Sequence, residues 1–355
     1  MISSARFSIL RTIVSILIAI GLSFLIIMLV SDSPVDAINK LITGPLGSKR
    51  LFANVIELMI PLIFTGVGVS IMFSANQTNM GSEGAFHIGG LVATVVALML
   101  PLPAGIHPLV AIVLGALAGS LFTFIPAILK IKTSASELVS SLMLNYLALF
   151  FSNYILSYYI RDTSAGALVS HSIPATAKLK IIVEGTNIHT GLIVAILVAL
   201  FGYIFLYKSK MGYVLRITGQ NEMFAKYSGM NISKVILVSQ ILGGFIAGLG
   251  GSIQLLGIYR RFSWTNLLGY GWDAVIVATL SKRNPLYVPL AAFFLAYIRI
   301  GADIMSRSTD VPPEIVAITQ GIIIILIVAE QFLSKYRHKI VAREAKALLE
   351  MEKEE

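Results

Sequence analysis

The chain has 355 residues, of which 56% are hydrophobic and only 13% are charged. Soluble domains carry about 25% charged residues, so this composition excludes a soluble globular protein and indicates a polytopic membrane protein. The formal net charge of +9 does not point to nucleic acid, because the basic residues lie in loops between apolar runs. The chain has no cysteine, which excludes disulfides, thiol catalysis and cysteine-based metal sites.

Ten apolar runs are candidates to cross the membrane, since a spanning helix needs about 17–25 residues. They are Phe7 to Val30, Leu51 to Phe73, Ala85 to Leu100, His107 to Leu129, Ser136 to Tyr159, Gly191 to Tyr207, Lys234 to Ile258, Leu268 to Leu280, Leu286 to Met305 and Pro313 to Leu333. The third and eighth runs are short, so each is either a span or a re-entrant segment. The sequence predicts an all-α polytopic membrane protein with about ten transmembrane helices, two of them short or broken near a central pore.

The distribution of lysine and arginine predicts the orientation of these spans. If the N-terminus is inside, the inner loops hold more basic residues than the outer ones, including Lys130, Lys132, Lys208 and Lys210. This bias favours a multi-pass protein of the cytoplasmic membrane with both termini in the cytoplasm. Residues 1–335 are expected to form the transmembrane domain, with 208–234 as its longest cytoplasmic loop, and residues 336–355 a charged cytoplasmic tail.

A polar, glycine-broken stretch, FSANQTNMGSEGAFHIGG from Phe73 to Gly90, separates two of the apolar runs. Backbone at membrane depth leaves regular helix only where protein or a water-filled cavity surrounds it. The stretch is therefore a pointer to a translocation path. The alternative is an ordinary short cytoplasmic loop with helix-capping polar residues.

Three carboxylates, Glu83, Glu137 and Asp273, lie beside or within apolar runs. A charge at the bilayer centre costs about 2.5–3.5 kcal/mol, so each must face a cavity, pair with a partner or lie at the interface. A helix N-cap at the membrane surface is the alternative for each, and we favour it for Glu137. Asn145, in the middle of an apolar run, needs a hydrogen-bond partner from another helix, either as pore lining or as packing glue.

The loop between the sixth and seventh runs contains a predicted short helix, Asn221 to Ser228, between two glycines. Asn221 can cap its start, Glu222 lies in the first turn where the helix dipole favours an anion, and Gly229 suits a left-handed end. Met223, Phe224 and Tyr227 give the helix an apolar stripe at helical spacing. Such a stripe fits an apolar groove on a partner protein. The alternative is that the stripe packs on the surface of this protein at the end of its membrane spans.

Glycine is frequent in the seventh run, which contains Gly243, Gly244, Gly248, Gly250 and Gly251. Small residues in a membrane helix allow neighbouring helices to approach closely. We therefore expect this run to pack closely against neighbouring helices.

Catalytic and metal-binding patterns are not found. The five histidines are scattered without metal-ligand spacing, and the GxxxxGK[ST] phosphate-binding loop is missing. We expect no metal and no cofactor in this chain, and no ATP hydrolysis by the chain itself.

Four segments resemble, in order, the permease subunits of ATP-binding-cassette (ABC) importers for ribose-type sugars, branched-chain amino acids and nucleosides. Asn79 to Gly84 (NMGSEG) is similar to the family's Asn-x-Gly-x-Glu-Gly motif, although Ala85 stands where the family usually has Gln. Glu137 to Tyr146, ending in Met-Leu-Asn-Tyr, resembles the start of the fifth span in the nucleoside branch, and Gly219 to Gly229 resembles the coupling helix. Gly271 to Leu280, followed by Asn284-Pro285, is similar to a Gly-Phe-Asp-Ala run and Asn-Pro of the same family.

The resemblance implies a permease subunit of an ATP-driven importer that moves nucleosides across the cytoplasmic membrane. It implies three partners: an ATPase subunit that binds the ATP, a second and different permease chain, and an extracytoplasmic substrate-binding lipoprotein. A ribose-type sugar permease is the alternative within the class. An ion-coupled secondary transporter is the alternative from another class, although few buried titratable residues are available for a relay.

The resemblance also assigns site residues. Coupling to the ATPase is assigned to Asn221, Glu222, Ala225 and Gly229, and the translocation pathway to Asn79, Gly81, Glu83, Gly84, Asn145 and Asp273. Glu83 and Asp273 are expected at corresponding positions of two halves, and paired glycine-interrupted segments mark the transport site in repeat-built transporters.

Overall fold

The computed structural model describes residues 21, 22, 24–322 and 325. Within this part of the chain the regular elements are helices, and strand-like pairing is limited to two isolated bridges, Arg161 with Ser170 and Ile181 with His189. The all-α prediction is confirmed for these residues.

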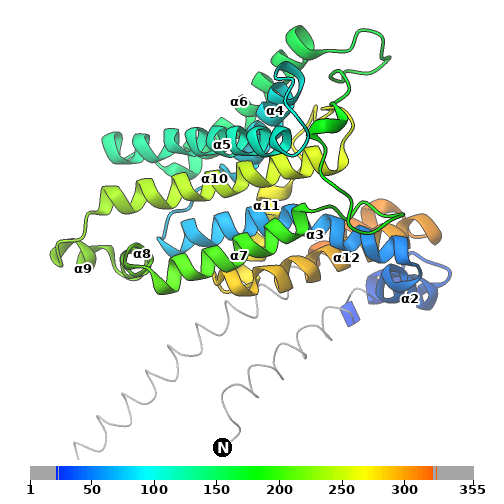
Figure 1. Cartoon of the computed structure of the whole chain (residues 1–355). Coiled ribbons are helices and arrows are strands. Elements are labelled where there is room, and N and C mark those ends of the chain that lie inside the picture. The colour runs from blue at the N-terminus through cyan, green and yellow to red at the C-terminus, as the bar shows by residue number, and fades with distance from the viewer. Residues whose placement is uncertain (1–20, 23, 323–324, 326–355) are drawn as a thin grey trace, which may run out of the picture. The chain divides into compact units, whose positions relative to one another are not determined.

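Seven segments are long and apolar enough to cross a membrane (Figure 1). They are α3 (Lys49–Ser74), α4 (Ser82–Met99), α5 (Ile106–Thr133), α6 (Glu137–Ile155) with its continuation η2 to Ile160, α7 (Gly191–Lys208), α10 (Ile232–Ile258), and η4 (Pro285–Tyr287) with α12 (Val288–Ser308). The eighth run forms α11 (Tyr270–Leu280), whose 11 residues rise only about 16 Å and do not span a bilayer.

Seven of the ten expected spans are thus confirmed, and one expectation needs correction. The third run is not a short helix, because α4 begins at Ser82 and its 18 residues include part of the polar stretch. The runs Phe7 to Val30 and Pro313 to Leu333 lie largely outside the described residues, as does the predicted tail 336–355. The count of about ten spans is therefore not confirmed: seven are found among the described residues, α11 is too short to cross, and the first and last runs stay predictions.

The chain divides into two compact units. The smaller comprises residues 1–48 and 297–355, and its described part includes α2 (Pro34–Thr43), η1 (Gly44–Leu46) and the end of α12. In it, the carboxylate of Asp310 accepts hydrogen bonds from the Ser31 hydroxyl at 2.6 Å and the Asp32 backbone N–H at 2.7 Å. These donors hold the pKa of Asp310 below its usual range, with the Ser31 hydroxyl as the main cause.

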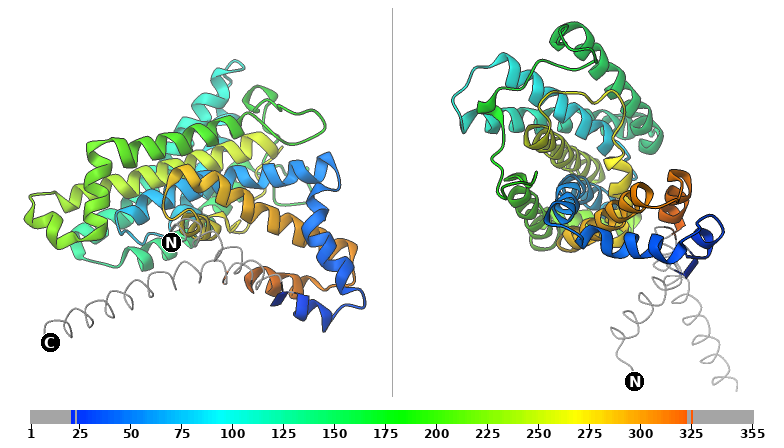
Figure 2. Two further views of the ribbon diagram at one scale, coloured as in Figure 1. Left: turned by 90° about the horizontal axis from the view of Figure 1, so that it is seen from below. Right: turned by 90° about the vertical axis from the view of Figure 1, so that its right-hand side faces the viewer.

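The larger unit, residues 49–296, is built around α10. This helix packs against α3, α4 and α5, and the end-on view in Figure 2 shows it among them. Glycines permit the approach: a Cβ at Gly248 would lie 2.7 Å from the carbonyl oxygen of Gly115, and one at Gly68 would lie 2.7 Å from that of Gly243. The prediction that the glycine-rich run packs closely against neighbouring helices is confirmed.

A long connection, residues 161–190, joins α6 to α7 and contains η3 (Ala175–Ala177). Asp162 pairs with Arg261 at 2.6 Å, which ties this connection to the segment that follows α10. The Ser164 hydroxyl and backbone N–H are the main reason that the pKa of Asp162 falls to about 2, with Arg261 adding to the effect. Backbone pairing between Ser170 and Phe262 holds the same two segments together.

Replacing Gly251 with alanine should lower the thermal stability of the protein in detergent. The added Cβ would overlap the carbonyl oxygen of Phe86, which is backbone and must shift. Overpacking of this kind costs about 1–3 kcal/mol. Thermal unfolding followed by fluorescence of the two tryptophans measures the change. Gly166→Ala is the matched control, because a Cβ there has no atom within 4 Å. Equal melting temperatures for the two variants would contradict the packing account.

Candidate functional site

The non-helical segment 75–81, between α3 and α4, runs into the helix bundle along α6. Three α6 side chains spaced four residues apart share one face of that helix and each accepts a backbone N–H of the incoming chain. The pairs are Glu137 Oε1 with Thr78 at 3.1 Å, Ser141 Oγ with Met80 at 3.0 Å, and Asn145 Oδ1 with Gly84 at 2.9 Å. Because a helix rises 1.5 Å per residue, Asn145 lies about 12 Å beyond Glu137. The chain therefore advances about two helical turns along α6 between Thr78 and Gly84, the third residue of α4.

Amide side chains bind the remaining polar groups of this segment. Asn79 is fully buried; its Oδ1 accepts the Gly81 N–H at 2.6 Å and its Nδ2 donates to Gln240 Oε1 of α10, also at 2.6 Å. Asn145 Nδ2 donates to the Met80 carbonyl oxygen at 3.0 Å. From the sequence we expect a hydrogen-bond partner for Asn145 from another helix. The structure supplies the Met80 carbonyl oxygen of the irregular segment and the backbone N–H of Gly84. Protein groups replace the water that is missing at membrane depth.

An ion pair lies beside the start of segment 75–81. Lys130 at the end of α5 lies 2.7 Å from Glu137 Oε1 and donates to Gln77 Oε1 at 2.9 Å. Glu137 is the first residue of α6 and is paired. Glu137 therefore lies at a helix N-terminus, one residue after the N-cap position of Ser136, and its level relative to the membrane surface stays a prediction.

Glu83 connects the polar stretch to α11. Its side chain is buried, and its carboxylate accepts the Gly269 N–H at 2.7 Å and the Gly271 N–H at 2.5 Å, where α11 begins. Unpaired N–H groups and the helix dipole favour an anion at this place. Gly269 has a φ of +85°, and a Cβ at Gly271 would lie 2.6 Å from the Glu83 Cα, so both positions require glycine.

A second irregular segment, residues 259–269, leads from the end of α10 to Glu83. Its aromatic side chains lie on α4: the Trp264 ring stacks on Phe86 with 5.6 Å between centroids, and Phe262 lies edge-on to His87 at 5.8 Å. Segment 75–81 enters from the end of the bundle where α10 begins, and segment 259–269 from the end where α10 finishes. Segment 259–269 thus ends on the Glu83 carboxylate, two residues after segment 75–81 ends.

The structure therefore brings most of the predicted pathway residues together. Asn79, Gly81, Glu83 and Gly84 belong to the 75–84 stretch, and Asn145 binds that stretch from α6. Buried Asp273 lies on α11, one turn after Gly269. All six residues are buried within the chain, and their role in translocation stays a prediction.

Sequence reasoning missed three of the residues that hold this site: Ser141, Gln240 and Lys130. The four-residue spacing of Glu137, Ser141 and Asn145 in an apolar helix was a signal that could have identified Ser141. Among the described residues, no three His, Asp or Glu side chains gather where they could hold a metal ion.

The predicted coupling helix is α9 (Glu222–Tyr227), which follows α8 (Lys210–Gln220) at one end of the larger unit (Figure 1). Asn221 caps α9 by accepting the Phe224 N–H at 2.9 Å, and Gly229 has a φ of +77°, so both end signals are confirmed. Ala225 is fully buried against the protein. The apolar stripe faces outward, with exposed fractions of 60% for Met223, 57% for Phe224 and 84% for Tyr227.

Replacing Glu83 with glutamine should destabilise the larger unit. Glutamine offers one acceptor oxygen in place of two, so either the Gly269 or the Gly271 N–H loses its partner. An unsatisfied buried donor costs about 1–3 kcal/mol, which thermal unfolding in detergent would detect. Glu184→Gln, at an exposed carboxylate, is the control. A Glu83→Gln protein that melts with the wild type would show that the carboxylate does not hold these segments together.

Comparison with known proteins identifies the family. Residues 51–328 match the family described as "Branched-chain amino acid transport system / permease component". The chain is 31% identical over 317 residues to the guanosine ABC transporter permease protein NupP of Bacillus subtilis, covering 88% of this chain and 91% of that protein. It is 28% identical over 346 residues to the nucleoside ABC transporter permease protein NupB of Lactococcus lactis, covering 94% of this chain and 93% of that protein. It is also 27% identical over 339 residues to the glucose ABC transporter permease protein TsgB13 of Haloferax volcanii, covering 92% of this chain and 88% of that protein. The chain belongs to this family of ABC transporter permeases and is a multi-pass membrane protein.

Proposed function

We propose that this chain is the permease subunit of an ATP-driven importer that moves nucleosides across the cytoplasmic membrane. The observation that carries the substrate is the similarity to NupP, which extends over 88% of the chain. The sequence Met143-Leu-Asn-Tyr146, which resembles the nucleoside branch, supports the same substrate class. The excess of basic residues in alternate loops supports a cytoplasmic location for both termini and for α8 and α9.

The proposed partner of α9 is the ATPase subunit. A short exposed helix with Met223, Phe224 and Tyr227 on its surface suits an apolar groove on a second protein. Buried Ala225 packs α9 against the rest of this chain. Movement of the ATPase against the apolar stripe would therefore displace α9 together with the elements around it, as a rigid body. Asn221, Glu222 and Gly229 set where this helix begins and ends. ATP is bound by the partner, and this chain supplies no group to its hydrolysis.

The proposed route from the ATPase to the pathway is α10. Asn231 caps α10 directly after the α9 turn, by accepting the Lys234 N–H at 2.9 Å. Gln240 lies about 14 Å farther along the same helix and holds Asn79. Displacement of α9 therefore reaches the irregular segment 75–81 through one rigid helix. Movement of that segment relative to Glu83 and α11 would open and close the path.

Two further partners complete the proposed importer. A second permease subunit, which we propose to be a different chain, would line the pore together with this one. An extracytoplasmic binding lipoprotein would deliver the substrate to the opposite end of the bundle from α8 and α9.

Replacing Gly229 with valine should uncouple transport without unfolding the membrane domain. A Cβ at this position has open space around it but the φ of +77° penalises it, at about 1–2 kcal/mol. The strain falls on the end of α9, so we expect normal membrane abundance with reduced ATPase co-purification and reduced ATP-driven uptake. Gly229→Asn is the matched control, because asparagine tolerates this conformation. Normal co-purification and normal uptake of the valine variant would show that α9 is not the coupling element.

Deleting the gene should abolish uptake of labelled purine or pyrimidine nucleosides and leave ribose and glucose uptake intact. A sugar substrate is the second candidate, supported by the 27% identity to the glucose permease of Haloferax volcanii. Uptake of all four classes of label in the deleted and complemented strains decides between them. Loss of sugar uptake with intact nucleoside uptake would move the assignment to sugars.

A further inference from the structure

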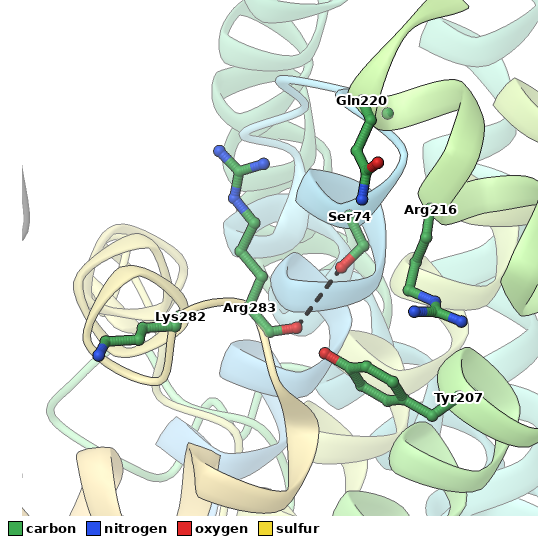
Figure 3. Close-up of a pocket in the computed structure, with 7 residues that line it drawn as sticks. Ser74, Tyr207, Arg216, Gln220, Lys282 and Arg283 are labelled. Atoms are coloured by element: carbon green, nitrogen blue, oxygen red, sulfur yellow. Dashed lines mark hydrogen bonds between the residues drawn. The ribbon is translucent and has the colours of Figure 1, made fainter. Parts of the chain in front are cut away.

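A basic cavity of about 200 Å³ opens at the end of the larger unit that carries α8 and α9 (Figure 3). The side chains that line it include Ser74, Tyr207, Arg216, Gln220, Lys282 and Arg283, with no carboxylate among them. In Figure 3 the arginines lie on opposite sides of Ser74, and Lys282 points toward the outside. Segments far apart in sequence, the ends of α3 and α7, α8, and the turn after α11, thus meet around one cationic space.

Both guanidinium groups are held in place by contacts that use only part of their capacity. Arg216 Nε donates to the Leu206 carbonyl oxygen at 3.0 Å, and its guanidinium carbon lies 4.7 Å from the centre of the Tyr207 ring. Arg283 Nη1 donates to the Phe73 carbonyl oxygen at 3.0 Å. A guanidinium has five N–H donors, so each arginine keeps others for a ligand. The ion pairs found among the described residues involve neither arginine.

The turn that presents Lys282 and Arg283 is strained. Their φ values are +54° and +61°, a region that residues other than glycine occupy at a cost of about 1–2 kcal/mol each. Strain of this kind is concentrated at ligand clamps and switch regions. Two consecutive cationic residues in a conformation that suits glycine indicate that their charges bind an anionic ligand.

We propose that this cavity binds the phosphate group of an anionic phospholipid. Arginine pairs with phosphate through two parallel N–H···O bonds, and basic pockets between membrane helices suit lipid headgroups. The cavity lies where spans end, with Tyr207 as an interfacial aromatic. The exposed apolar side chains Leu286, Tyr287 and Leu290 follow directly after Arg283, where acyl chains can lie against them. This surface favours a lipid over free phosphate as the source of the anion.

A bound headgroup would join α8 to the turn after α11, since Arg216 belongs to one and Arg283 to the other. The proposal does not depend on the transported substrate or on ATPase docking. It is tested by binding and stability, without a transport assay.

The test is thermal unfolding of the purified full-length chain in detergent with added short-chain phosphatidylglycerol, phosphatidylcholine or inorganic phosphate. We expect phosphatidylglycerol alone to raise the melting temperature of the wild type by several degrees. The combined variant Arg216→Gln and Arg283→Gln should lose this rise. Lys282→Glu, which reverses one charge at the edge of the cavity and leaves both arginine contacts in place, should reduce the rise. Lys208→Gln with Lys210→Gln, outside the cavity at the same end, should keep it.

Other outcomes would overturn the proposal. If phosphatidylglycerol has no effect on the wild type, or stabilises the Lys282→Glu variant as much as the wild type, the cavity is not the lipid site. If inorganic phosphate gives the same rise as phosphatidylglycerol, the ligand is a free anion and the lipid assignment is wrong.

Discussion

Hydrogen bonding of two irregular backbone segments inside a helix bundle is the constraint on which the site depends. Where no water is available, an unpaired backbone N–H or C=O costs several kcal/mol, so irregular chain exists only where protein groups bind it. Segment 75–81 is bound by one face of α6 and by Gln240. Segment 259–269 ends on the Glu83 carboxylate. The side chains of Glu137, Ser141, Asn145 and Glu83 each accept a specific backbone N–H here, and removal of any of them leaves that N–H without its partner.

The same contacts connect α9 to segment 75–81 through α10, and so provide a route for movement between them. Irregular segments are more easily displaced than helices, because their shape is set by a few side-chain contacts. The glycine-packed α10 lies against α3, α4 and α5, begins beside α9 and holds Asn79 through Gln240. A transporter needs one stiff element that receives force and one compliant element that responds. In the proposed function, α10 has the first role and segment 75–81 the second.

The sequence predicted local features well and distant partners poorly. Hydropathy located the seven confirmed spans, and short-range rules predicted the ends of α9 from Asn221 and Gly229. The start of α4 was placed too late because Ser82 and Glu83 look like loop residues, although burial and the contacts to α11 make them helical. Helix α8 was missed because Gly212 and Gly219 interrupt a polar stretch, although both are needed for close packing. The partner of Glu83 lies 186 residues away at Gly269, and no local pattern encodes such a pairing.

Reconstitution tests the central claim, that this permease is driven by a separate ATPase through α9, most directly. The chain is placed in liposomes with its partner permease, with or without the ATPase subunit, and uptake of labelled nucleoside is measured with ATP or with an ion gradient. The account predicts uphill uptake only when the ATPase and ATP are both present. Uphill uptake by vesicles that lack the ATPase, driven by an ion gradient, would contradict it.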